Sequence, residues 1–562
     1  MCGLFGAWGW SQQLNTTAAL EALISRGPDD QGEFRDSCGL TLLHTRLSIQ
    51  DLSPLGHQPM QTSDHSLVIV FNGEIYNQLQ LRRELEDAGC IFRSQSDTEV
   101  LLHGFRHWGQ QLWHRLNGIF AVACWEPQLQ QLTLARDRFG VKPLLWKKEQ
   151  RRLVFASELS ALIASGCCRK DALNPKAIES FLLWGSVAAP DTILDGVKVF
   201  PPGHWASCQL GQSWQLQRFS SKKQPTQWNE LNLSEATTQT SLALERAVQR
   251  QSIGERPVGL FLSGGLDSGL LAAELRRQQQ GDIHSVSVGF EGLPGAIDES
   301  DLAAQTAQAL GLTHQRLAIG PQQLEKSFDS FLEAIDQPSI DGFNSHLVTQ
   351  AARQQEMVVA FSGLGADELF GGYSHMKPGP LEHQLRARRL KLHGVKTQNR
   401  QILEKNRSQG LPRDVTLSQC SELEIKGYLH DTLLRDSDAV TMAQGLELRV
   451  PFLDAELVDL ALSIPAELHQ AEGPKTLLRK IASSQLPQAV LDAPKKGFNL
   501  ALAPWLEQQQ RFNPKRIWGL LKKHQLQLSL RSFWGSWLLL RLSGRFKPYW
   551  RYVVLAEWLN QY

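Results

Sequence analysis

The first residue able to act as a nucleophile is Cys2, which follows the initiator methionine in MCGLFGAWGW. A small second residue usually permits removal of that methionine, and Cys2 would then carry both a thiol and a free α-amino group. Because the unperturbed pKa of an α-amino group is about 7.7–8.0, part of it is neutral near pH 7–8 and can accept a proton. Nucleophile and general base would then share one residue, as in N-terminal threonine enzymes. The alternative is a small apolar residue at the start of a strand.

An oxyanion-binding pair is predicted in FNGEIYN, residues 71–77. The side-chain amide of Asn72 stands next to the backbone N–H of Gly73, and two adjacent donors are what an oxyanion hole requires.

A binding site for an amino acid is predicted from three charged residues. Arg46 can hold a carboxylate through two parallel hydrogen bonds, and the carboxylates of Glu74 and Asp97 can hold an ammonium group. One guanidinium and two carboxylates suit a zwitterion whose side-chain amide faces Cys2. Each residue alone is more often a surface ion-pair partner or turn former, so the prediction depends on their joint occurrence.

A phosphate-binding turn is predicted at LSGGLDSG, residues 262–269. The strand-like run PVGLFL (257–262) leads into the glycines, and a helix is expected to begin near Asp267. Glycine N–H groups and a helix N-terminus both favour phosphate oxygens. No lysine follows the glycines, unlike in the loop that handles terminal phosphates. The pattern SGGxDS is instead similar to the pyrophosphate loop of ATP pyrophosphatases, which transfer AMP; the alternative is an ordinary glycine-rich turn.

A second glycine turn follows another strand-like run, in FSGLGADELFGGY, residues 361–373. Pyrophosphate and ATP both require Mg²⁺, which prefers carboxylate and phosphate oxygens. Asp267 and Asp367, each expected at the end of a parallel strand, are the predicted magnesium ligands. The alternative is that each aspartate only caps its helix.

The elements that position these residues change character along the chain. Up to about residue 210, short strand-like runs (67–77, 118–126, 132–137 and 152–158) predict an α+β domain of layered antiparallel sheets. Residues 211–235 are polar and predict a linker. From 236 to 562, strands alternate with helices and predict an α/β domain with a parallel sheet.

Bulk composition is that of a globular protein, with 42% hydrophobic residues, 20% charged residues and a formal net charge of +1. No nucleic-acid or membrane partner is expected from that balance, and no signal peptide or stretch of about 18 apolar residues is found, so we expect a cytoplasmic protein. The eight scattered cysteines suggest neither a disulfide framework nor a zinc site. In the tryptophan-rich, basic tail (517–559), the spacing of Trp550, Val553, Val554 and Trp558 predicts a packing helix.

These stretches together resemble a known pair of domains. The first half is similar to the class II glutamine amidotransferase domain, whose members have an N-terminal-nucleophile hydrolase fold, in MCGLFG, RGPDDQG (26–32), RLSIQDLS (46–53), FNGEIYN, SDTEV (96–100), ARDRFGVKPL (135–144), FASEL (155–159) and PPGH (201–204). The second half is similar to the synthetase domain of glutamine-hydrolysing asparagine synthetases in SGGLDS, SGLGADELFGGY, LELRVPFLD (446–454) and GPKTLLRK (473–480). The resemblance runs nearly end to end and in order.

The resemblance implies a ligase of asparagine biosynthesis with two sites. Cys2 attacks glutamine, Asn72 and Gly73 stabilise the oxyanion, and ammonia passes internally to a second site, where an acyl-AMP intermediate forms and Lys475 steadies the developing charge. Mg²⁺ is the implied cofactor, glutamine, ATP and aspartate are the implied substrates, and a homodimer is the expected assembly. Implied glutamine-binding residues are Arg46, Leu47, Ser48, Ile49, Asn72, Gly73, Glu74 and Asp97. Implied ATP-binding residues are Leu262, Ser263, Gly264, Gly265, Asp267, Ser268, Val288, Ser362 and Gly363.

One position departs from the family pattern. Asparagine synthetases of the enteric and animal type read S-G-E-G at the second turn, with a glutamate associated with the acyl-AMP, whereas this chain has Leu364. Leucine can neither contact an ammonium group nor act as a base. Aspartate remains the expected acceptor, and the alternative is a different carboxylate: a sugar acid, a peptide or a β-lactam-type precursor. A non-catalytic, storage-like protein is a third reading, against which the intact Cys2, Asn72, Asp97, Asp267 and Lys475 argue.

Overall fold

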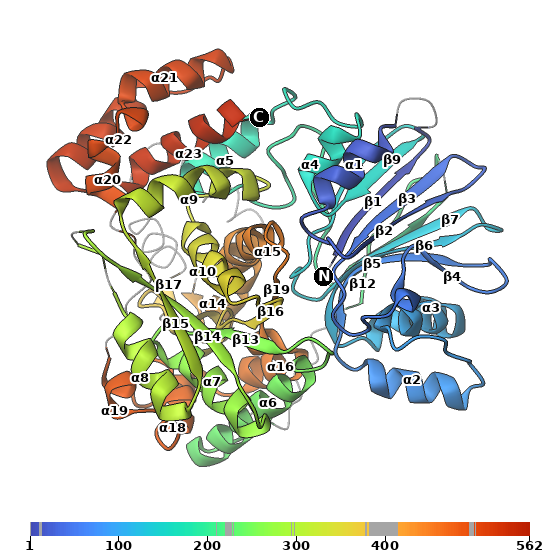
Figure 1. Ribbon diagram of the computed structural model, residues 1–562, viewed down its shortest axis with the longest axis horizontal. Helices are drawn as coiled ribbons and strands as arrows, with labels where there is room; N and C mark the ends of the chain where they lie inside the picture. The colour runs from blue at the N-terminus through green and yellow to red at the C-terminus, as the bar shows by residue number, and fades with distance from the viewer. Residues whose placement is uncertain are drawn as a thin grey trace.

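Two units meet face to face in the computed structural model (Figure 1). The structure describes residues 2–10, 14–209, 211–219, 228, 230–293, 295–296, 298–376, 379–380, 414–493, 500 and 502–561. Part of the predicted linker, 220–227 and 229, lies outside the described residues. Among the described residues, no helix is both long enough and apolar enough to cross a membrane.

The first unit stacks two antiparallel sheets of six strands, as the sequence predicts. One sheet has the order β10-β8-β9-β1-β3-β2 and the other β12-β11-β7-β6-β5-β4. The strands are β1 (Cys2–Trp8), β2 (Asp30–Arg35), β3 (Leu40–Arg46), β4 (Met60–Gln61), β5 (Val68–Ile75), β6 (Gly118–Glu126), β7 (Gln131–Arg136), β8 (Leu145–Glu149), β9 (Arg152–Ala156), β10 (Lys198–Val199), β11 (His204–Cys208) and β12 (Gln217–Arg218). Since β12 pairs with β11, this sheet extends beyond the predicted boundary at 210.

Alternation along β1 explains the layering. Leu4 and Trp8 point into the core between the two sheets, where Trp8 meets Trp125 of the other sheet edge-on with ring centroids 5.0 Å apart. Phe5 and Ala7 point the other way, toward the covering helices. Successive side chains of a strand face opposite sides, so a strand buried on both faces reads as continuously apolar.

Helices cover the outer faces of both sheets (Figure 1). Those of the first unit are α1 (Thr16–Leu23), α2 (Gln78–Asp87), α3 (Asp97–Trp108), α4 (Leu159–Ala164) and α5 (Pro175–Trp184). Helix α1 lies beside α4, over the sheet that contains β1, while α2 and α3 cover the sheet that contains β5. The result is four layers, helix–sheet–sheet–helix.

The second unit is built on a parallel sheet with the order β15-β14-β13-β16-β19. Its strands are β13 (Val258–Phe261), β14 (His284–Phe290), β15 (Thr313–Ile319), β16 (Val359–Phe361) and β19 (Glu447–Arg449); β17 (Gly379–Pro380) and β18 (Asp414–Val415) form a separate pair. The parallel α/β architecture is the predicted one. Strands β13 and β16, which lead into the two glycine turns, are direct neighbours.

The helices of the second unit pack on both faces of this sheet and extend beyond it (Figure 1). They are α6 (Leu233–Gln251), α7 (Leu266–Gln278), α8 (Ser300–Leu310), α9 (Pro321–Ala334), α10 (Phe343–Gln354), α11 (Ala366–Phe370), α14 (Leu417–Glu424), α15 (Arg435–Met442), α16 (Ala455–Ser463), α17 (Ala466–His469), α18 (Thr476–Ala482), α19 (Gln488–Asp492), α20 (Leu502–Gln508), α21 (Pro514–Lys523), α22 (Leu530–Ser543) and α23 (Lys547–Gln561).

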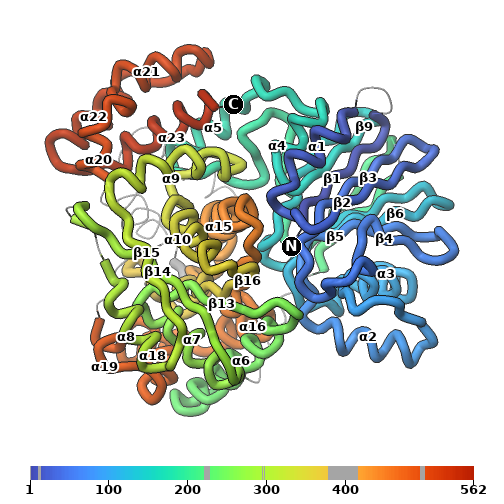
Figure 2. Tube along the Cα trace, viewed as in Figure 1, coloured from blue at the N-terminus to red at the C-terminus, as the bar shows by residue number. Residues whose placement is uncertain are grey.

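The tryptophan-rich tail packs as a helix, which confirms the prediction. Trp550, Val553, Val554 and Trp558 on α23 are at most 1% exposed. Figures 1 and 2 both place α23 beside α9 of the second unit and α5 of the first, and side chains of all three helices share one core cluster.

Buried ion pairs join the two units. Asp438 of α15 accepts hydrogen bonds from Arg26 Nη2 at 2.8 Å and from Lys142 Nζ at 2.9 Å, both in the first unit. Arg26 is fully buried and also pairs with Glu158 at 2.8 Å. Removing one partner of a buried ion pair is costly because the remaining charge stays buried without full compensation.

We therefore expect Arg26→Met to lower the free energy of unfolding by about 3–5 kcal/mol. The control is Arg169→Met, which removes an exposed ion pair with Asp171 and should leave stability unchanged. Denaturant unfolding followed by circular dichroism measures both. Equal stability of the two variants would contradict the structural importance of this contact.

Candidate functional site

Cys2 lies where the two units meet, at the first position of β1. Its backbone N donates to Asn72 Oδ1 at 3.1 Å, and its carbonyl accepts from Arg26 Nε at 3.2 Å. Across the sheet it pairs in register with Arg46. Burial raises the pKa of the Cys2 thiol, and a hydrogen bond from the Leu47 backbone opposes this shift. A thiol held neutral in this way needs a base at hand to become a nucleophile.

Asn72 and Gly73 stand in the middle of β5, against the start of β1. Asn72 is fully buried, and its Nδ2 has no hydrogen-bond partner among the described residues. A buried donor without a partner carries an energetic cost, which an incoming oxygen would relieve. At Gly73, a Cβ would lie 2.0 Å from the Ile119 carbonyl oxygen, so only glycine fits here. Asn72 therefore lies beside Cys2 with a side-chain N–H left unpartnered by the described residues, and Gly73 follows it in the strand.

Glu74 and Asp97 converge at the same site, Glu74 from β5 and Asp97 from the start of α3. Asp97 Oδ2 accepts from the Ile75 backbone at 2.9 Å. Burial raises the pKa of Asp97 to about 7. Burial, followed by the charges of Glu447 and Asp97, raises the pKa of Glu74 well above its usual range. A cation bound nearby would stabilise the ionised form of these buried carboxylates, and an ammonium group would be such a cation.

Gln50 occupies the space between these carboxylates. Its Nε2 donates to Glu74 Oε2 and, at 3.2 Å, to Asp97 Oδ2. The side-chain amide thus stands where the ammonium group of an amino acid would bind.

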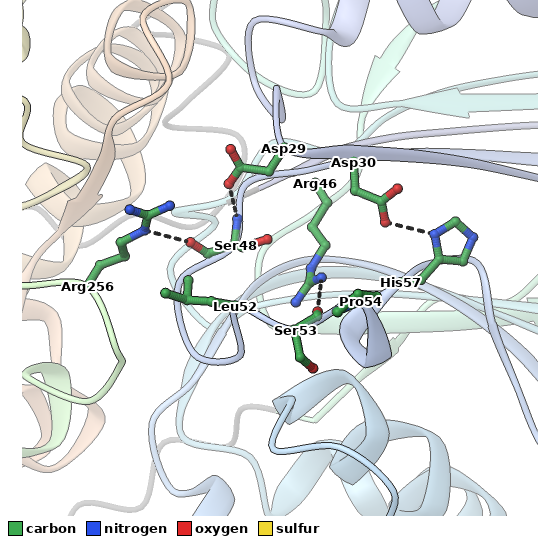
Figure 3. Close-up of a pocket in the computed structure, with 9 residues that line it drawn as sticks. All are labelled: Asp29, Asp30, Arg46, Ser48, Leu52, Ser53, Pro54, His57 and Arg256. Carbon is green, nitrogen blue, oxygen red and sulfur yellow. Dashed lines mark hydrogen bonds and ion pairs between the residues drawn. The ribbon is translucent and has the colours of Figure 1, made fainter.

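Arg46 faces a cavity of about 400 Å³ (Figure 3). Its Nη1 donates to the Ser53 carbonyl at 2.8 Å, and its Nη2 donates to the Asp51 carbonyl. Gly56 packs directly on the guanidinium, since a Cβ there would lie 2.0 Å from Nη2. The cavity is lined by Asp29, Asp30, Arg46, Ser48, Leu52, Ser53, Pro54, His57 and Arg256.

The three other predicted glutamine-binding residues follow Arg46 along the chain. Leu47 presents its N–H to the Cys2 thiol, and the Ser48 N donates to Asp29 Oδ2 at 2.7 Å. Ile49 is buried, and its carbonyl accepts from Glu255 N of the second unit at 2.8 Å. Every predicted residue of this site therefore lies within one region at the boundary of the two units.

The first glycine turn joins β13 to α7. Ser263 bonds Ser268 Oγ through both its N, at 3.1 Å, and its Oγ, at 3.0 Å. Gly264 has φ +70°, and a Cβ there would lie 2.5 Å from the Glu299 carbonyl oxygen. Gly265 is the N-cap of α7 and supplies no side-chain cap, so the first N–H groups of this helix are not capped by a side chain.

The two glycine turns touch each other. A Cβ on Gly363 would lie 3.1 Å from Asp267 Cβ and 3.4 Å from the Ser268 N. Ser362 N donates to the Arg449 carbonyl at 3.0 Å, which fixes the second turn against β19. Leu262 N donates to the Val286 carbonyl of β14, and Val288 lies further along that strand. Leu364 packs partly buried against the apolar core.

Lys475 joins the two predicted magnesium ligands. Its Nζ lies 2.7 and 2.6 Å from the two carboxylate oxygens of Asp267 and 2.5 Å from Asp367 Oδ1. Burial alone would lower the pKa of Lys475, but the two carboxylates outweigh it and raise the pKa. At Gly372 a Cβ would lie 1.8 Å from Asp367 Oδ1, so glycine is required for this approach.

Neither aspartate caps its helix, because the N-caps are Gly265 and Gly365. Both carboxylates are bonded to Lys475 in this structure, so they would hold Mg²⁺ only together with ATP, because Mg²⁺ usually takes one or two carboxylates and fills its remaining positions with phosphate oxygens and water. Within the described part of the chain, no group of three or more His, Cys, Asp or Glu side chains is arranged to hold a metal ion. ATP phosphates would have to supply part of the coordination.

Comparisons with known proteins agree with this geometry. Residues 1–220 match the family model described as a glutamine amidotransferase domain, and residues 239–532 match the one described as asparagine synthase. Asparagine synthetase [glutamine-hydrolyzing] 1 of Bacillus subtilis (strain 168) is 31% identical, covering 91% of this chain and 88% of the relative. Asparagine synthetase [glutamine-hydrolyzing] 3 of the same organism is 28% identical, covering 95% and 94%.

The fold and the two sites define a glutamine amidotransferase domain joined to a nucleotide-binding α/β domain, in one enzyme of the ligase class. The chain belongs to the asparagine synthase family.

Sequence reasoning assigned no role to several residues of these sites, namely Arg26, Gln50, Gly56, Gly372 and Arg449. Arg26, Gln50, Gly372 and Arg449 all stand inside the motifs quoted above, at 26–32, 46–53, 361–373 and 446–454, so the sequence could have drawn attention to these positions. The motif around Gln50 places it next to predicted glutamine-binding residues but does not indicate that its side chain reaches Glu74.

The pKa of Asp97 leads to a pH prediction. An ammonium group binds the ionised carboxylate, so glutamine should bind the Cys2→Ala protein more weakly as the pH falls below about 7, by up to about tenfold per pH unit. Calorimetric titration between pH 5.5 and 7.5 measures this dependence without turnover. The control Asp97→Asn should bind weakly at every pH. Constant or tighter binding at low pH would contradict the assignment.

Proposed function

We propose that this protein is a glutamine-hydrolysing asparagine synthetase, converting ATP, aspartate, glutamine and water to asparagine, glutamate, AMP and pyrophosphate. The observation that carries the proposal is the contact of Lys475 with Asp267 and Asp367 where two glycine turns meet, in the same chain as a buried Cys2 bonded to Asn72. The homodimer and the cytoplasmic location expected from the sequence stay predictions.

Glutamine hydrolysis would use the residues around Cys2. After removal of Met1, the α-amino group of Cys2 takes the thiol proton, and sulfur attacks the side-chain amide carbon. The tetrahedral oxyanion accepts hydrogen bonds from Asn72 Nδ2 and the Gly73 N–H. Collapse expels ammonia, which leaves with the proton held by the amine, and water then hydrolyses the thioester to glutamate and free Cys2.

Synthesis would take place at the glycine turns. A carboxylate is a poor acyl donor, so a carboxylate oxygen of the acceptor attacks the α-phosphorus of ATP and pyrophosphate leaves. Ammonia then attacks the carbonyl carbon of the acyl-AMP, and AMP is the leaving group. Bound Mg²⁺ would neutralise phosphate charge. Turn N–H groups and the start of α7 bind the phosphates, and Lys475 offsets the negative charge that develops on them.

The acceptor is the point at which Leu364 matters. Its side chain packs against the core and offers no group to an ammonium. Leu364 is therefore the reason to keep, as the second candidate, the same chemistry on another carboxylate, such as a sugar acid, a peptide or a β-lactam-type precursor. Aspartate remains the proposed acceptor because the other motifs of the family are present.

One assay tests both reaction and acceptor. Protein incubated with ATP, MgCl₂, glutamine and a panel of carboxylates should release pyrophosphate and AMP in equal amounts, and only with aspartate. The matched control is Lys475→Met, which should lose pyrophosphate release and keep glutamate release. Formation of ADP and phosphate would contradict AMP transfer. Pyrophosphate release with another carboxylate, and none with aspartate, would show that the other carboxylate is the acceptor.

A further inference from the structure

The second unit reaches the glutamine site at the end where the carboxylates lie. Arg449, at the end of β19, is fully buried; its Nε donates to Glu447, and its Nη1 donates to the Ile253 carbonyl at 2.6 Å and also to the Gln251 carbonyl. Its Nη2 lies 3.7 Å from Glu74 Oε2 and makes no hydrogen bond among the described residues. This nitrogen is the part of the guanidinium directed at the first unit.

Charge balance makes this contact important. Glu74, Asp97 and Glu447 are all buried at one place, and Arg449 is the guanidinium that contacts two of them. Burial and the neighbouring carboxylates favour the neutral form of Glu74, and the charge of Arg449 opposes them. Without this arginine, Glu74 would be a weaker partner for an ammonium group.

The second unit also reaches the cavity that Arg46 faces. Arg256, which leads into β13, donates from Nε to the Ser48 carbonyl at 3.4 Å. Its side chain lines the same cavity as Arg46, together with the carboxylates of Asp29, which is bonded to the Ser48 N, and of Asp30, which is paired with His57 (Figure 3). Both terminal nitrogens of Arg46 already donate to backbone carbonyls, and Asp29 and Asp30 have partners of their own, so Arg256 is the cation of this cavity that could add contacts to a carboxylate.

We propose that the nucleotide-binding domain completes the glutamine site: Arg256 binds the substrate α-carboxylate together with Arg46, and Arg449 is a positioning residue that holds Glu74 against the substrate ammonium. This inference rests on the proposed hydrolysis of glutamine at Cys2. Both arginines are also connected through the backbone to the proposed ATP site. Arg256 precedes β13, the strand that enters the first glycine turn, and the Arg449 carbonyl accepts a hydrogen bond from Ser362 N in the second turn. Glutamine affinity would therefore depend on contact between the domains.

The first arm of the test changes Arg256 to Gln in the full-length protein and measures glutamate release. We expect the KM for glutamine to rise about tenfold, with the loss falling on KM and not on kcat, as for removal of a ground-state contact. The matched control is Arg138→Gln, which removes another arginine of the domain boundary, bonded to Asp459 at 2.9 Å, and should leave KM unchanged. Ammonia-dependent synthesis by each preparation reports whether its second domain is folded.

The second arm is a double-mutant cycle between Arg449→Lys and Glu74→Gln. Lysine keeps the charge of Arg449 but cannot bond Glu447 and reach Glu74 at once, so it should raise the KM for glutamine about tenfold. In the Glu74→Gln background the same change should add nothing, because Arg449 acts through that carboxylate.

Three results would overturn the inference. These are an Arg256→Gln protein that behaves like the Arg138→Gln control, an Arg449 effect that adds fully to that of Glu74→Gln, and loss of ammonia-dependent synthesis in parallel with glutamine affinity in either arginine variant. Absence of glutamine hydrolysis in the unmodified protein would instead reject the proposed function, so the two failures are distinguishable.

Discussion

The structure depends on one buried guanidinium. Arg26 bonds the carbonyl of Cys2 and, through its other nitrogens, Glu158 of its own domain and Asp438 of the second. The guanidinium that fixes the backbone of Cys2 thus also joins the two domains. Burying charged groups is tolerated energetically only when every charge has a partner, and Lys142 is the second cation bonded to Asp438.

This arrangement answers a chemical requirement. In the proposed reaction, ammonia formed at Cys2 would act as a nucleophile only while it stayed unprotonated, which would favour a route through protein over release into water. A domain boundary made of buried ion pairs and apolar side chains, with α23 packed against helices of both domains, holds the two sites in a fixed relation. The contact of Arg449 with Glu74 is a further link between the domains, and it lies at the proposed glutamine site.

Local patterns predicted the elements well. The run at 118–126 is β6 with the same bounds, and the helix expected to begin near Asp267 is α7, which begins at Leu266. The residues around Cys2 and both glycine turns were also found by type and spacing. Strand order and the contacts of Gln50 and Arg449 were not, because they join residues far apart in sequence, and no local pattern encodes which partner a buried side chain will meet. The roles of Lys475 and Val288 came from resemblance alone.

The central claim is that nitrogen release and carboxylate activation take place at separate sites of one chain. Cys2→Ala tests it most directly, because the substitution removes the sulfur while leaving the contacts of Lys475 untouched. Product formation should be measured with glutamine and, separately, with ammonium chloride as the nitrogen donor. The account predicts loss of the glutamine-dependent reaction with the ammonia-dependent reaction retained. Loss of both in a protein that stays folded would contradict it.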